Sequence, residues 1–310
     1  RIIHKNTLGK AYYYMGRNFS FANKIADAAD CYIKADRLQI DDLIYRGRVN
    51  SCMGYICRQN NIDTLALIFY ERSNKVFKES GDEWDYAQSI LNLVQCQINL
   101  QLFGIADSLL QVSQNYQLEN DYQARWYETQ GLYFYAQQQY DSALVYLNRG
   151  LDYWQLEDVK CFCYLKIMQV YYDLNKLQLA IPYAKLVLSI SNNPNYVSNA
   201  YYCLMQDAKN RNKTELLSQY AHARTDAQQL LREYMLQDAE AIPILEEYLQ
   251  NPYPLRWVWI VMCAIVALCF ILIISIIIYR KHTTTQIKVS NDQIVSLSVQ
   301  IQAQQDELQK

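Results

Sequence analysis

Apolar residues of alternating size recur along the chain at an interval of 37 to 40 residues. Alanine stands at one point of this pattern, usually with a larger apolar residue four positions later and often with glycine twelve positions earlier. The alanines are Ala28, Ala66, Ala106, Ala143 and Ala180. The later positions hold Tyr32, Tyr70, Leu110, Leu147 and Ala184, and the earlier ones Gly16, Gly54, Val94, Gly131 and Met168. This period predicts a stack of two-helix units, in which small side chains let paired helices approach closely.

The residues around these positions carry a family resemblance. The first unit has the succession Tyr12, Met15-Gly16, Phe19, Ala28, Tyr32 and Ala35. The third unit is degenerate, and a weaker sixth can be placed on Leu204, Leu216 and Tyr220. The pattern resembles the tetratricopeptide repeat, and the resemblance covers about residues 9–222. It implies an all-α solenoid of five to six helical hairpins over residues 1–222, followed by a capping or linker helix over 223–252. A helical-hairpin solenoid of another type is the alternative.

An uncharged apolar run covers residues 257–279, with Trp257, Trp259 and Tyr279 near its ends. As a helix, these 23 residues would be ~34 Å long, and the hydrocarbon core of a bilayer is ~30 Å thick. Aromatic side chains favour the boundary with the lipid headgroups. The run therefore predicts a single transmembrane helix.

Basic residues predict the orientation of that span. Arg280, Lys281 and Lys288 follow it, whereas only Arg256 precedes it closely, and basic residues favour the cytoplasmic side. We therefore expect a bacterial inner-membrane protein with periplasmic repeats and a cytoplasmic tail. Because no cleavable signal peptide opens the sequence, this orientation implies a natural start upstream. The alternative is a tail anchor with cytoplasmic repeats. The repeats contain seven cysteines, and this odd number is a poor disulfide framework that would suit a reducing compartment.

Residues 280–310 carry Ile287, Ile294, Ile301 and Leu308 at heptad spacing. This spacing favours a juxtamembrane helix, and it allows a coiled coil and a homodimer through the span and the tail. A solvated single helix is the alternative, because most of the partnering positions are polar.

Composition and motifs argue against several function classes. A net charge of −2 and a pI near 6.0 give no electrostatic basis for nucleic-acid binding. The sequence lacks a phosphate-binding loop, a zinc-protease motif and a nucleophile elbow. His4, His222 and His282 are far apart in sequence. We therefore predict a protein that is not an enzyme and has neither cofactor nor metal.

The family resemblance also implies a binding groove, since the first helix of each repeat lines the concave surface. Transferred to this chain, the groove positions are Tyr13, Arg17, Arg48, Tyr55, Arg58, Gln95, Asn99, Arg125, Tyr135, Gln169 and Tyr172. Aromatic rings beside guanidinium groups suit a peptide that contains acidic residues. The Lys/Asn clamp of chaperone-binding relatives is replaced here by Tyr13, Arg17 and Tyr55. The alternative is that these residues form an ordinary solvated surface.

These features together predict a membrane-anchored scaffold or receptor that binds a protein or peptide in the groove of a repeat array. A second hypothesis is the sensor portion of a histidine kinase or helix-turn-helix regulator whose output domain is absent from this chain.

Overall fold

The computed structural model describes residues 2–116, 119–251, 262, 264–276, 279 and 280. The chain divides into two compact units, residues 1–250 and 251–310. Regular structure in the described part of the first unit is helical. Its helices are α1 (Ile2–Phe21), α2 (Ile25–Arg37), α3 (Leu43–Gln59), α4 (Asp63–Ser80), α5 (Glu83–Asn99), α6 (Phe103–Ser113), α7 (Asn120–Ala136), α8 (Tyr140–Tyr153), α9 (Glu157–Asp173), α10 (Leu177–Ile190), α11 (Pro194–Asn210), α12 (Thr214–Ala239) and α13 (Ala241–Gln250).

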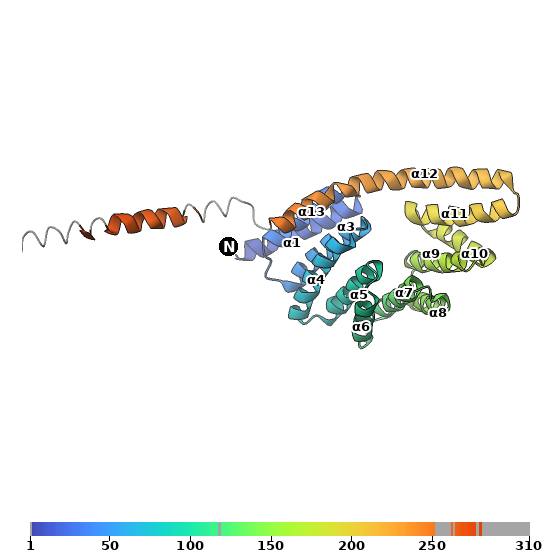
Figure 1. Ribbon diagram of the computed structural model, residues 1–310, viewed down its shortest axis with the longest axis horizontal. Coiled ribbons are helices and arrows are strands. Elements are labelled where there is room, and N and C mark those ends of the chain that lie inside the picture. Colours follow the sequence, from blue (N-terminus) through green and yellow to red (C-terminus); the bar gives the residue numbers. More distant parts are fainter. Residues whose placement is uncertain (1, 117–118, 252–261, 263, 277–278, 281–310) are drawn as a thin grey trace, which may run out of the picture. The chain divides into compact units, whose positions relative to one another are not determined.

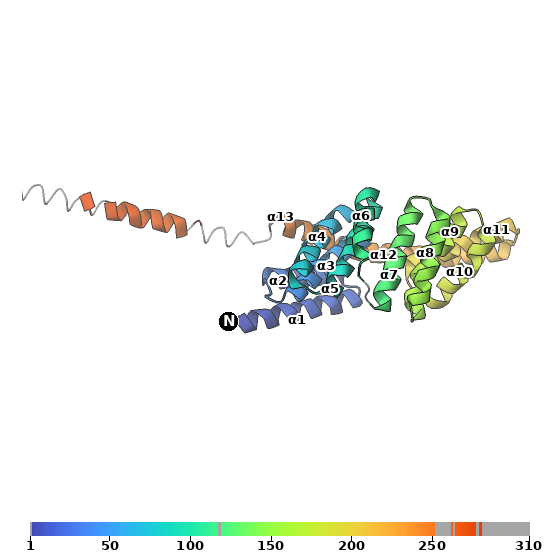
Figure 2. The same ribbon diagram turned by 90° about the horizontal axis from the view of Figure 1, so that it is seen from below.

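Consecutive helices pair as antiparallel hairpins, from α1–α2 to α11–α12. Each hairpin also packs against the next one, so that the odd-numbered helices of neighbouring hairpins lie side by side (Figures 1 and 2). The fold is thus an all-α array of helical hairpins like that of tetratricopeptide repeats. The structure places the weak sixth unit on α11 and α12, with Leu204 buried between neighbouring helices.

The repeating small residues act as predicted from the sequence. All five alanines are fully buried in the second helices of their hairpins. A Cβ atom added to Gly16 would lie 2.6 Å from the Tyr32 ring, and one added to Gly131 would lie 2.6 Å from Leu147 Cγ. Gly54 faces Tyr70 in the same way. Glycine thus leaves the space that a large side chain of the partner helix fills.

Each hairpin turn contains a residue with left-handed backbone geometry. These residues are Asn23, Asn61, Gln101, Gln138, Asn175 and Asn212, with φ between 54° and 61°. The amide after each one bonds a carbonyl near the end of the first helix; Lys24 N, for example, donates to Phe19 O at 2.9 Å. This arrangement ends the first helix and satisfies a carbonyl that the helix leaves free. Sequence reasoning missed these turns because they contain asparagine or glutamine instead of glycine.

The segment predicted as a capping helix over 223–252 contains the second half of α12 and all of α13. The break at Glu240 precedes Pro243, whose ring in a continuous helix would clash with the carbonyl of Ala239, four residues earlier. Helix α13 packs mainly against α2, in the first hairpin. The segment therefore connects the last hairpin to the first.

The predicted transmembrane helix and inner-membrane location need correction. No helix in the described parts of the chain combines the length and the apolar character that crossing a bilayer requires. The longest helical run described within 257–279 is 264–276, and its 13 residues would reach only ~20 Å of the ~30 Å needed. Residues 257–261, 263, 277 and 278 lie outside the described residues. The predicted tail helix beyond 280, its coiled coil and the homodimer through it also lie outside them.

The substitution Gly131→Ala should destabilise the array by about 1–3 kcal/mol, because the new methyl group would overlap Leu147. Gly104→Ala is a matched control, since a Cβ there meets no atom within 4 Å, and it should stabilise α6 by up to about 1 kcal/mol. Urea unfolding followed by circular dichroism measures both changes. Equal stability of the two variants would contradict this packing.

The substitution Gln138→Gly should stabilise the protein by up to about 1 kcal/mol, because glycine adopts positive φ without the steric penalty of a side chain. The neighbouring Gln137→Gly, at φ −87°, should instead be destabilising by about 0.5–1 kcal/mol. Thermal unfolding of the two variants checks the sign of each effect. A loss of stability in Gln138→Gly would show that the left-handed turn is not under strain.

Candidate binding groove

Two cavities lie along the first helices of successive hairpins. One, of about 440 Å³, is bordered by Arg17, Tyr55, Arg58 and Arg125 among others. The second, of about 490 Å³, is lined by residues of α3, α5, α7 and α9, with Arg58 common to both cavities. We call this pair of cavities the groove. Seven of the eleven residues predicted from the family resemblance line it, namely Arg17, Tyr55, Arg58, Gln95, Asn99, Arg125 and Tyr135.

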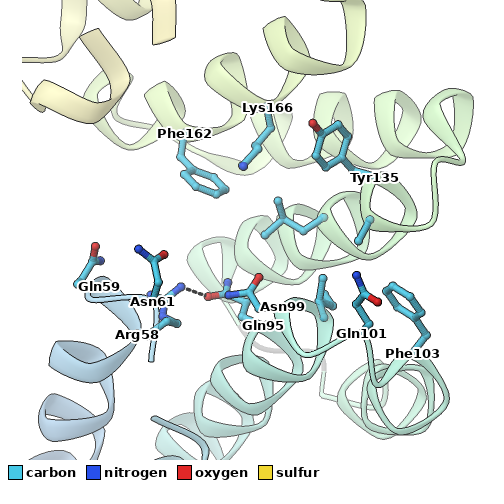
Figure 3. Close-up of a pocket in the computed structure, with 13 residues that line it drawn as sticks. Arg58, Gln59, Asn61, Gln95, Asn99, Gln101, Phe103, Tyr135, Phe162 and Lys166 are labelled. Carbon is cyan, nitrogen blue, oxygen red and sulfur yellow. Dashed lines mark hydrogen bonds between the residues drawn. The ribbon is translucent and has the colours of Figure 1, made fainter. Parts of the chain in front are cut away.

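Arg58 stands at the centre of the groove. Its Nη1 donates a hydrogen bond of 2.6 Å to Gln95 Oε1 (Figure 3). Its guanidinium carbon lies 5.6 Å from the centroid of the Tyr55 ring, within the range of a cation–π contact. Its buried Nε has no hydrogen-bond partner. The guanidinium is therefore held in place while part of its donor capacity stays unused.

Arg125 reaches the groove from α7. It donates to the side-chain oxygens of Gln88 and Asn92, the latter at 3.0 Å. Burial lowers the pKa of Arg125, because removal from water penalises its charged form. Two amides of α5 thus orient this guanidinium without neutralising it.

Lys166 lines the groove from α9, and Glu128 of α7 lies near the groove cations. Lys166 Nζ donates to Gln169 Oε1 at 3.1 Å and lies 5.4 Å from the ring centroid of Phe162. Burial lowers the pKa of Lys166. Burial also raises the pKa of Glu128 to about 6, although nearby Arg125 and Arg58 act in the opposite direction. Cys163 Sγ approaches Glu128 Oε2 at 3.9 Å.

The charges of the groove are unbalanced. Among the described residues, Arg58, Arg125 and Lys166 have no carboxylate within 4.0 Å. Among the acidic residues, Glu128 has the strongest electrostatic interaction with Arg125 and with Lys166. The groove is therefore locally positive although the chain as a whole has a net charge of −2.

The remaining predicted residues occupy other environments. Tyr13 is buried, with its ring centroid 5.4 Å from that of Tyr45. Arg48 forms an ion pair of 2.9 Å with Asp85. Gln169 holds Lys166, and Tyr172 donates to Tyr202 Oη at 3.3 Å. Two of the lining residues donate hydrogen bonds to carboxylates: Asn99 to Asp63 at 3.0 Å, and Tyr135 to Asp173 at 2.8 Å.

Sequence reasoning missed three residues that line the groove, Asn92, Phe162 and Lys166, and two that interact with Arg125, Gln88 and Glu128. They precede or follow predicted residues at helical spacings of three or seven. On α5, for example, Gln88, Asn92, Gln95 and Asn99 lie on one helix face. Extending each predicted position by this spacing would have found them. The described residues include no group of three or more His, Cys, Asp or Glu side chains arranged to hold a metal ion.

Comparisons with known proteins give a limited context. No family model matches the chain, and no curated protein matches it. One similar solved structure is described as "Functional Characterization of Pseudomonas Aeruginosa pilF". It shares 15% sequence identity with this chain and has a TM-score of 0.48, over 79% of this chain and 99% of that one. None of these comparisons supports the hypothesis of a histidine-kinase or helix-turn-helix sensor.

The raised pKa of Glu128 predicts a pH-dependent stability. Between the ordinary pKa of 4.5 and about 6, the folded protein binds a proton that the unfolded chain has released. Folding stability from this group is therefore lost as pH rises through this window, by up to about 2 kcal/mol. The free energy of unfolding of the wild type, minus that of Glu128→Gln, should fall accordingly between pH 4 and pH 7.

Urea unfolding at several pH values measures this difference. Glu119→Gln, at an exposed position, is the control and should leave the pH dependence of the wild type unchanged. If the Glu128→Gln and wild-type curves run parallel, the carboxyl is not desolvated in the folded state.

Proposed function

We propose that this chain is a non-enzymatic interaction scaffold whose groove binds an acidic polypeptide segment of a partner protein. The observation that supports this most directly is the set of three cationic side chains, Arg58, Arg125 and Lys166, that line the groove with no carboxylate within ion-pair distance among the described residues. A bound segment with aspartate or glutamate residues would supply the missing negative charge.

The hydrogen bonds within the groove prepare it for such a ligand. Gln95 fixes Arg58, and Gln88 and Asn92 fix Arg125. Because these side chains are already ordered, binding loses less conformational entropy than it would with free arginines. Charge-assisted bonds from guanidinium to carboxylate are also about twice as strong as neutral ones. The arrangement thus favours carboxylates over neutral side chains.

Aromatic rings give the groove a second kind of contact. Tyr55 lies beside Arg58, and Phe162 and Tyr135 lie beside Lys166. Figure 3 shows the Phe162 and Tyr135 rings on opposite sides of Lys166. Such rings offer large apolar contact areas at little cost in side-chain entropy. We therefore expect the ligand to combine acidic residues with apolar or aromatic ones.

A fluorescein-labelled peptide of alternating glutamate and tyrosine is a suitable probe. Fluorescence anisotropy should show saturable binding to the wild type and an affinity about tenfold lower, or weaker, in the double variant Arg58→Gln/Arg125→Gln. Binding should weaken as salt increases, because the attraction is partly electrostatic. Arg149→Gln, an exposed position on α8 outside the groove, is the control. Equal binding by the control and the double variant would remove the basis of the proposal.

A further inference from the structure

The end of the helical unit returns to its beginning. Helix α12 starts against α11, and Figure 1 shows it running from there toward α1 and α3, where α13 follows. The hairpins between these two points follow an arc, so that α12 joins its ends. We call α12 and α13 together the strap.

Four side chains of α13 are buried against the first two hairpins: Ala241, Ile242, Leu245 and Tyr248. The Tyr248 ring stacks on Phe69 of α4, with centroids 6.5 Å apart and an angle of 9° between the planes. Its hydroxyl donates a hydrogen bond to the Asp36 carboxylate of α2. The guanidinium carbon of Arg37 lies 5.8 Å from the centroid of the same ring. Tyr248 is therefore the central contact of α13.

The α13 end of the strap contacts a neighbour of the groove, and the α12 end contacts α11. At the first hairpins, Phe69 packs on Tyr248 while its neighbour Tyr70 lines the groove together with Arg58. At the last hairpin, Arg224 of α12 lies 4.5 Å from the ring centroid of Tyr202. Tyr202 in turn accepts the hydrogen bond of Tyr172. A change in the position of α13 would therefore alter the surroundings of the groove beside Phe69 and Tyr70.

The middle of the strap has little support from packing. In the second half of α12, Leu230, Tyr234, Met235 and Leu236 are 36–71% exposed. The helical break before Pro243 separates α13 from this stretch. Few buried contacts and a break between two helices are properties of segments that open locally, ahead of global unfolding.

We infer that α13 is a releasable latch and that its release from α2 and α4 frees one end of the strap and opens the groove to its ligand. The coupling to ligand entry rests on the function proposed above. The latch itself does not, because release of α13 can be measured without any ligand.

Hydrogen–deuterium exchange of the full chain tests the latch. The amides of 241–250 should exchange at least about tenfold faster than those of α3 and α4. Tyr248→Ala should accelerate exchange in α13 and at its contact surface on α2, and leave α9 and α10 unchanged. Tyr248→Phe keeps the stacked ring but lacks the hydrogen bond to Asp36, so that its effect should be intermediate. Tyr234→Ala, at an exposed site on α12, is the control.

The latch is refuted if α13 is protected as strongly as α3 and α4 in the wild type. It is equally refuted if Tyr248→Phe, which retains the ring, accelerates exchange throughout α1–α11, since α13 would then be an integral part of the core. If Tyr248→Ala fails to fold, the wild type and Tyr248→Phe still decide the question.

Binding kinetics test the coupling. The glutamate–tyrosine probe should associate at least about threefold faster with Tyr248→Ala, or with Tyr248→Phe, than with the wild type or Tyr234→Ala. Unchanged association with these variants would overturn the opening of the groove by release. If the probe binds none of these proteins, the coupling and the proposed ligand class fail together, and the exchange experiment alone judges the latch.

Discussion

The close contact between a small residue on one helix and a large residue on its partner underlies the whole array. Gly16, Gly54 and Gly131 each face the side chain that lies sixteen residues later, Tyr32, Tyr70 or Leu147. This contact sets the separation of the two helices in a hairpin, because a methyl group at the glycine would overlap the larger side chain. Repetition of the contact aligns the first helices of successive hairpins.

That alignment is what brings the chemistry of the groove together. Arg58, Gln95 and Lys166 come from α3, α5 and α9, and none of them is close to another in sequence. Helix α5 supplies the amides that hold the arginines on either side of it, Arg58 of α3 and Arg125 of α7. The positive character of the groove is therefore a property of the stack, since the chain as a whole carries a small negative charge.

Burial has opposite consequences in the two parts of the molecule that bear on function. In the groove it destabilises charges, which raises the pKa of Glu128 and lowers that of Arg125. At α13 it stabilises an apolar surface, where Leu245 and Tyr248 cover Phe69. The cations of the groove have no ion-pair partner among the described residues, whereas the surface under α13 has its partner within the chain.

The features that repeat at short range can be predicted from the residue pattern. The small and large residues that meet within a hairpin are sixteen positions apart, so that their spacing alone predicts the helix pairs. Seven groove residues follow from the family resemblance, and three more, Asn92, Phe162 and Lys166, lie at helical spacing from predicted positions. The uncharged run 257–279, however, provides only a hydropathy signal. The span predicted from it is wrong, because no helix in the described part of the chain is long and apolar enough to cross a bilayer.

The point at which the chain returns on itself depends on packing between helices that are distant in sequence. The same packing determines which cations have no ion-pair partner. Tyr248 meets Asp36 across 212 positions, and no local pattern encodes a contact over that distance. Whether an arginine is paired depends likewise on the carboxylates that other helices bring near it. Arg48 meets Asp85, whereas Arg58 meets an amide. Both outcomes depend on how the hairpins stack, because side chains that meet in space can come from hairpins that are far apart in the sequence.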